Sequence, residues 1–140
     1  MTSLRPFHLA FPVRDLADAR AFYGTLLGCK EGRSSAEWVD FNFFGHQLVA
    51  HLSPDEPEHK AHNLVDGDAV PVRHFGVILT MEAWRELVER LTRAKIAFLI
   101  PPEIRFEGLP GEQATFFIRD PSGNALEFKA FENDARIFAQ

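Results

Sequence analysis

The sequence contains a single cysteine, no long apolar run and no cluster of basic residues. Cys29 alone cannot form a disulfide within the chain, which agrees with a reducing compartment, and we expect a cytoplasmic protein. The longest apolar runs, such as Phe75–Leu79 and Ile96–Ile100, hold five residues. A helix needs about 20 residues to span a bilayer, so we expect no membrane segment. The formal net charge is −5 and lysine and arginine do not cluster, so nucleic-acid binding is not expected.

Motifs for two common kinds of catalysis are also missing. The sequence has no glycine-rich loop that could cradle a phosphate and no strand-to-helix elbow around a nucleophilic serine, so nucleotide and serine-hydrolase chemistry have no support. What is present is a chain of 140 residues with 46% apolar and 25% charged side chains, the profile of one globular domain. Phenylalanine supplies 14 of the 17 aromatic residues, which indicates either a tightly filled interior or an apolar pocket.

The same order of patterns occurs twice along the chain. Residues Phe7–Val13 alternate, which predicts a strand whose odd-numbered side chains, beginning with Phe7, cover a helix. That helix is expected from an N-cap at Asp15 to Gly28. A second strand around Phe75–Leu79 is followed by a second amphipathic helix that Thr80 can cap. The repeat therefore predicts two similar modules.

The rest of the sequence divides into further strands and one long connection. Strands are expected in both halves, at residues 38–44, 46–52, 96–100, 114–119 and 124–131. The connection is rich in Pro, Asp and Glu and occupies residues 53–71. His74 follows His8 by 66 residues, which is the offset of the repeat. We predict a single domain, residues 1–140, with module 1 at about 5–53, a linker at about 54–71, module 2 at about 72–131 and a tail at 132–140.

Three side chains that can bind metal fall on the same kind of strand face. Neighbouring residues on a strand point to opposite sides, so the apolar residues that cover a helix leave their neighbours on the other face. By this rule His8, His74 and Glu127 lie away from the helices. Two imidazoles and one carboxylate with open positions form the donor set of a facial-triad iron site and also suit other divalent ions. The pattern therefore predicts that these three residues hold a metal ion.

A fourth position of this site has two candidates. Val49 and His51 share the strand face predicted for the site. Aligning the glycine turns that precede the last strand of each module makes Val49 equivalent to Glu127, whereas a shift of two residues would place His51 there. The residues alone leave both alternatives open.

Four segments, in this order and spacing, point to a known family: FHLAFPVRDL at 7–16, FYGTLLG at 22–28, RHFGV at 73–77 and DPSGNALEF at 120–128. In them the chain resembles the vicinal oxygen chelate superfamily, the glyoxalase, bleomycin-resistance and extradiol-dioxygenase group. The resemblance implies an α+β fold in which two paired βαβββ modules form an open, cup-shaped mixed sheet with helices on the outer face. It also implies that His8, His74 and Glu127 match the family's metal ligands and that His51 occupies the fourth, variable position.

The resemblance further implies an enzyme that acts on a small molecule. The chain is similar to short predicted extradiol dioxygenases, which implies Fe(II) as cofactor, a catechol-like substrate and a proton-handling role for His51. The same triad accepts Ni, Zn or Mn in place of Fe(II). Arg105, Gln113 and Lys129 are candidates for contacts with the substrate. Family members commonly pair as homodimers, so we expect a homodimer with no nucleic-acid or membrane partner.

Two other functions stay open. A glyoxalase-like lyase or isomerase normally uses a carboxylate or amide at the fourth position, where this chain offers His51 or Val49. A non-enzymatic drug-binding dimer of the bleomycin-resistance kind would use an aromatic groove and no metal. One departure counts against the dioxygenase, because such enzymes usually add a tyrosine near the substrate. The only tyrosine here, Tyr23, lies on the predicted core side of a helix.

Overall fold

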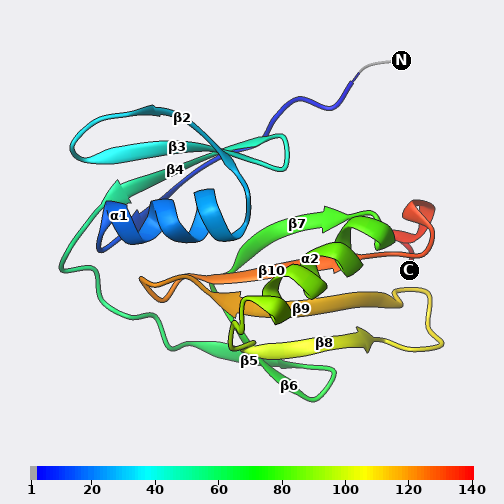
Figure 1. Ribbon diagram of the computed structural model, residues 1–140. Helices are drawn as coiled ribbons and strands as arrows, with labels where there is room; N and C mark the ends of the chain where they lie inside the picture. Colours follow the sequence, from blue (N-terminus) through cyan, green and yellow to red (C-terminus); the bar gives the residue numbers. More distant parts are fainter. Residues whose placement is uncertain (1–2) are drawn as a thin grey trace. The chain divides into compact units, whose positions relative to one another are not determined.

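The computed structural model describes residues 3–140, which form two compact units (Figure 1). The first unit runs to Glu58 and includes Asp120–Ser122, and the second unit comprises His59–Arg119 and Gly123–Gln140. Each unit contains one four-stranded sheet with parallel and antiparallel pairs. No helix within residues 3–140 is long and apolar enough to cross a membrane.

The first unit is a βαβββ module. Its elements are β1 (His8–Val13), α1 (Leu16–Ala19), the π-helical segment η1 (Arg20–Leu26), β2 (Lys30–Ser34), β3 (Trp38–Phe43) and β4 (His46–Leu52). The strand order is β1-β4-β3-β2, in which β1 and β4 are parallel and the other neighbours antiparallel.

The second unit repeats this module and adds a hairpin before it. Its elements are β5 (His62–Val65), β6 (Asp68–Pro71), β7 (Phe75–Leu79), α2 (Met81–Arg93), β8 (Ile100–Arg105), β9 (Gln113–Arg119), β10 (Ala125–Ala130) and the 3-10 turn η2 (Asp134–Arg136). The larger sheet has the order β7-β10-β9-β8, in which β7 and β10 are parallel, as β1 and β4 are in the first unit. The predicted α+β fold with two βαβββ modules is confirmed.

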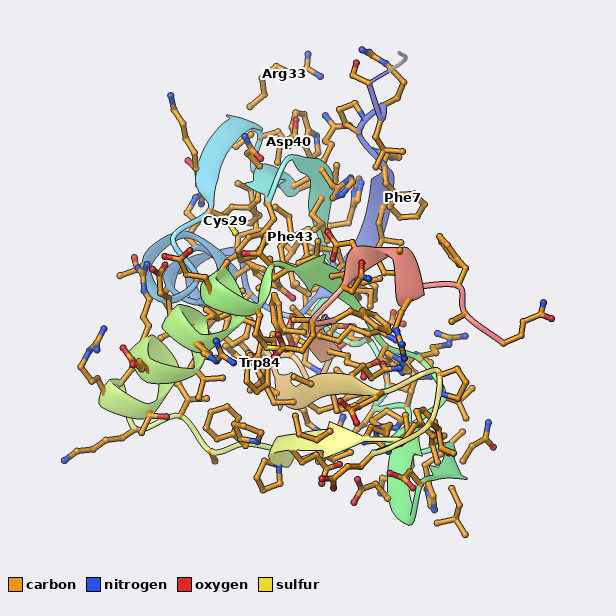
Figure 2. The ribbon with its side chains drawn as sticks, turned by 90° about the vertical axis from the view of Figure 1, so that its right-hand side faces the viewer. Phe7, Cys29, Arg33, Asp40, Phe43 and Trp84 are labelled. Carbon is orange, nitrogen blue, oxygen red and sulfur yellow. The ribbon has the colours of Figure 1, made fainter. Side chains whose placement is uncertain are left out.

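The helices begin where the sequence predicts and cover one face of each sheet. Asp15 accepts a hydrogen bond from the amide of Asp18 at 2.8 Å, and Thr80 caps α2 in the same way at 3.2 Å. In the second unit the Trp84 indole, labelled on α2 in Figure 2, donates to the Phe128 carbonyl of β10 at 2.9 Å. The helices thus cover one face of each sheet, and the candidate site lies on the other face.

Tyr23 is the centre of the first core. Its ring lies 5.3 Å from the Phe11 ring and 5.5 Å from the Phe41 ring, measured between centroids. Its hydroxyl donates to the Asp120 carboxylate at 2.8 Å, and both residues are buried. The only tyrosine is therefore a core residue, as the helix pattern predicts. Phe7, labelled in Figure 2, precedes β1. It is 64% exposed, so the expectation that it covers the helix is wrong.

The largest departure from the sequence-based expectation is the predicted linker, which contains the β5–β6 hairpin. Asp66 and Gly67 form its two-residue turn with φ of 48° and 87°, the backbone that an Asp-Gly pair favours. The hairpin's strands are short and follow a polar stretch, so their periodicity is weak. This segment belongs to the second unit.

Two strands and one helix also differ from expectation. The strand predicted at 96–100 lies at Ile100–Arg105, because an edge strand with an irregular register tolerates its two prolines. The strand Lys30–Ser34 is exposed at every residue and has no apolar face that a pattern could reveal. The first helix is α-helical for four residues only and continues as a π-helix to Leu26.

Candidate metal centre

His74 and Glu127 lie together on the face of the second sheet that α2 does not cover. The parallel pairing of β7 with β10 brings them side by side, and His74 Nε2 lies 3.2 Å from Glu127 Oε1. The other carboxylate oxygen accepts a hydrogen bond from the buried Thr115 hydroxyl at 2.5 Å. Lys129 Nζ lies 4.0 Å from Glu127 Oε1. The pair is therefore a polar site with a nearly buried carboxylate, since Glu127 is 8% exposed.

The His74 imidazole is held by two further contacts. Its Nδ1 lies 2.7 Å from the carbonyl oxygen of Pro71, the last residue of β6. Because a carbonyl only accepts hydrogen bonds, Nδ1 carries the proton, and Nε2 is the nitrogen that can bind a metal. The Phe117 ring meets the imidazole edge to face, with centroids 5.0 Å apart. Metal-binding histidines are typically oriented through the other ring nitrogen in this manner.

The pKa values of the two partners shift in opposite directions. The hydrogen bond with Glu127 raises the pKa of His74, against an opposing effect of burial, and the Pro71 carbonyl adds to the rise. Burial raises the pKa of Glu127, but the hydrogen bonds from His74 and Thr115 outweigh it, so that the pKa of Glu127 is lowered overall. Both shifts favour the ionised pair, an imidazolium beside a carboxylate. A divalent ion would replace the proton on Nε2, because metal ligands bind in the deprotonated form.

His8 has an equivalent arrangement in the first unit. It lies at the start of β1, opposite Gln47 of β4, and its Nδ1 is 2.8 Å from the side-chain oxygen of Gln47. Here too an oxygen accepts a hydrogen bond from Nδ1–H, so Nε2 is the nitrogen that could bind a metal. Among residues 3–140 no three His, Cys, Asp or Glu side chains gather into a group that could hold a metal. The joint action of His8 with His74 and Glu127 stays a prediction.

The strand registers of the two sheets show whether Val49 or His51 is equivalent to Glu127. Glu127 lies opposite Gly76, two residues after His74. In the first sheet Val49 lies opposite Ala10, two residues after His8. Val49 is therefore the structural equivalent of Glu127.

His51 comes two residues after Val49 on the same strand face. It is exposed, pairs with Pro12 and is equivalent to Lys129. The register supports the alternative with Val49 at the fourth position, and a proton-handling role for His51 stays a prediction.

Arg105, a candidate for substrate contact, is buried and bound within its own unit. Its side chain is only 3% exposed, and its guanidinium donates to the carbonyl of Val65 at 2.5 Å, to Asp68 at 3.1 Å and to Glu103 at 3.0 Å. These bonds tie β8 to the β5–β6 hairpin. A contact of Arg105 with a substrate stays a prediction.

The other two candidates for substrate contacts are less constrained. Gln113 begins β9, is half-buried and donates to the carbonyl of Gly111 at 3.0 Å. Lys129 is half-buried on β10 beside Glu127. Of the predicted side chains, the structure therefore brings His74, Glu127 and Lys129 together, and contacts of Gln113 with a substrate stay a prediction.

The sequence interpretation missed the residues that support the ligands. Thr115 and Phe117 alternate on β9 and share the face of Glu127, so strand parity applied to β9 would have found them. Pro71 gave no such signal, because its contact depends on a hairpin that the sequence does not predict. Strand parity places Gln47 on the same face as Val49, but its contact with His8 follows only from the register of β1 with β4.

Comparisons with known proteins show the family of the chain and its fold. A family model described as the Glyoxalase/Bleomycin resistance protein/Dioxygenase superfamily matches residues 5–128. The crystal structure of a glyoxalase/bleomycin resistance protein/dioxygenase from Alicyclobacillus acidocaldarius is 38% identical, with a TM-score of 0.82 over 95% of this chain and 96% of that one. No curated protein sequence matches the chain significantly.

More distant solved structures share the fold. A lactoylglutathione lyase from Agrobacterium tumefaciens is 19% identical, with a TM-score of 0.66 over 96% of both chains. A fosfomycin resistance protein from Listeria monocytogenes is 18% identical, with a TM-score of 0.66 over 99% of both chains. The same fold is thus found in proteins described by different activities.

Proposed function

Because the chain belongs to the glyoxalase, bleomycin resistance protein and dioxygenase superfamily, we propose that it is a metal-dependent enzyme acting on a small molecule. His8, His74 and Glu127 are the proposed ligands. The observation that carries the proposal is the 3.2 Å contact of His74 Nε2 with a nearly buried carboxylate. An imidazole whose Nδ1 is already bound to a carbonyl supports the assignment, since this is how a protein prepares Nε2 for a metal.

The donor set fits a divalent ion. Two neutral imidazoles and one carboxylate suit Fe(II), and Mn, Ni and Zn also accept this set. Bound Fe(II) would supply the redox chemistry with dioxygen and bind the two adjacent oxygens of a substrate. The chain's own residues hold and orient these ligands: Thr115 fixes one oxygen of Glu127, and Lys129 places a positive charge beside the other.

We further propose an extradiol-type dioxygenase that acts on a catechol-like compound. Support comes from the donor set, which is that of non-haem iron oxygenases with open coordination positions. Val49 at the position equivalent to Glu127 also favours this activity over a glyoxalase-like lyase, because valine supplies neither a ligand nor a base. His51 and Gln113 remain candidates for proton transfer and substrate contact. A homodimer in the cytoplasm is part of the same proposal.

Anaerobic loading with Fe(II), followed by oxygen-uptake measurements with a panel of catechols, tests the activity. We expect uptake by the wild type and none by His74→Ala, which should lose metal and keep its fold because the imidazole is at the sheet surface, with its side chain 29% exposed. Turnover of a hemithioacetal without oxygen uptake would point to the lyase. Purified protein that retains no transition metal and cannot be loaded would instead support a drug-binding module.

A further inference from the structure

We propose that Arg105 is a positioning residue for His74, acting through the β5–β6 hairpin. The guanidinium fixes the hairpin at its turn, and the other end of the hairpin fixes the imidazole. This inference rests on the proposed metal role of His74. It gives the buried arginine a task in preparing the metal ligand, 31 positions earlier in the sequence.

Arg105 binds both sides of the hairpin turn. Val65 and Asp68 flank the two turn residues of the hairpin. Arg105 donates to the carbonyl oxygen of Val65 through Nη1 and to the Asp68 carboxylate through Nη2. The amide of Phe106 adds a bond of 3.2 Å to the Asp66 carboxylate inside the turn. The end of β8 therefore binds both strands of the hairpin.

The orientation of the β5–β6 hairpin depends on its contacts with the larger sheet. A two-stranded hairpin alone is marginally stable in water, so its orientation depends on what it packs against. Val70 and Val65 pack against Ile100 and Phe117 of the larger sheet. This apolar contact has no direction of its own, so the directional bonds of Arg105 add a restraint on the orientation of the hairpin.

The other end of the hairpin contacts His74, the proposed metal ligand. β6 ends at Pro71, whose carbonyl accepts the Nδ1 proton of His74, and Phe117, on which the hairpin packs, also touches the imidazole. A hairpin that is free to swing would remove the hydrogen-bond acceptor and loosen the packing of the ring. With only Glu127 left to accept its proton, neutral His74 would carry that proton on Nε2 in a larger share of molecules, and fewer molecules would be ready to bind metal.

The buried charge of Arg105 is consistent with a fixed position. A guanidinium that is only 3% exposed must be paired, and Asp68 and Glu103 supply two carboxylates. A hydrogen bond with Asp68, together with burial, raises the pKa of Glu103, which shows that the two carboxyl groups are close. Arg105 thus joins a carboxylate on the hairpin to a carboxylate on its own strand.

The test compares Arg105→Met with Arg85→Met, which removes an exposed ion pair of α2 with Glu132 in the same unit. Zn²⁺ affinity is measured by chelator competition. The Nδ1 proton of His74 is followed by long-range ¹H–¹⁵N NMR on metal-free protein at a pH where the imidazole is neutral. For Arg105→Met we expect a Zn²⁺ affinity about 10- to 100-fold lower and a larger share of the Nε2–H tautomer than in the wild type. Arg85→Met should change neither quantity.

Milder variants keep the inference testable if Arg105→Met does not fold. Asp68→Asn weakens the contact of Arg105 with the hairpin, whereas Glu103→Gln leaves the bonds of Arg105 to Val65 and Asp68 in place. We expect the first to shift the tautomers of His74 and the second to leave them unchanged. Equal effects of the two, or a folded Arg105→Met variant with unchanged tautomers, would overturn the proposal. If the wild type binds no Zn²⁺, the metal function fails, but the tautomer comparison still decides the role of Arg105.

Discussion

Replacing Thr115 by valine tests how the protein holds its proposed metal ligand. The two side chains have nearly the same shape, so the change removes one hydroxyl from a site with no exposed surface and leaves Glu127 Oε2 without its 2.5 Å donor. A hydrogen bond to a charged group contributes about 1.5–3 kcal/mol. We expect the free energy of unfolding of the metal-free protein to fall by about 2 kcal/mol. Loss of carboxylate orientation should lower metal affinity by about 10- to 100-fold.

The sign of the pH dependence adds a second check on this variant. The pKa of Glu127 is lowered from its ordinary value of 4.5, so its interactions stabilise the fold above that pH and are lost as the pH falls through the folded-state pKa. The stability difference between wild type and Thr115→Val should therefore be full near neutrality and vanish in acid.

Urea unfolding over a pH series and chelator competition measure these two quantities. Thr115→Ser is the control, because it keeps the hydroxyl and loses only a methyl group, at a cost of about 1 kcal/mol in stability. Its metal affinity should equal that of the wild type. If Thr115→Val binds metal as tightly as Thr115→Ser, the hydrogen bond does not orient Glu127 and the reasoning is refuted.

Three further predictions concern both units. Gln47→Leu removes the hydrogen-bond acceptor of His8 Nδ1 and should lower metal affinity about tenfold. Gln47→Glu keeps an acceptor and should retain the wild-type affinity. Equal affinities of the two variants in a chelator titration would contradict the role of Gln47. Burial and then Asp120 raise the pKa of Tyr23 well above 10, so stability should fall as the pH rises above 10. Tyrosinate absorbance should rise only as the circular dichroism signal of the fold is lost, and an earlier rise would refute the burial argument. Leu91→Ala in α2 should cost about 2–5 kcal/mol in urea unfolding, against less than about 0.5 for the exposed Arg93→Ala.

The repeat, the helix starts and the pairing of His74 with Glu127 could be predicted because they depend on local signals. A cap such as Asp15 or Thr80 acts within three residues of itself, and strand parity assigns a face without knowledge of the partner strand. The 66-residue offset then links the two histidines.

The Asp-Gly turn of the hairpin is a local signal, but the position of the hairpin could not be predicted in this way, because Arg105 binds Val65 from 40 residues away and no local pattern encodes that bond. Phe7 was assigned to the core because alternation extends one residue beyond the strand. The choice between Val49 and His51 needed the register of β1 with β4, which depends on hydrogen bonds between strands and not on composition.

The inclusion of Asp120–Ser122 in the first unit has a consequence for how the protein is made. The ribosome completes the first unit's own strands early, yet the partner of the Tyr23 hydroxyl is 97 residues further along the chain. Until Asp120 emerges, that core has a tyrosine with no acceptor, so the first unit is finished only after most of the second has been synthesised. A gene cut between residues 58 and 59 would yield two sequence repeats, but only one of the two products would contain every residue of its unit's core.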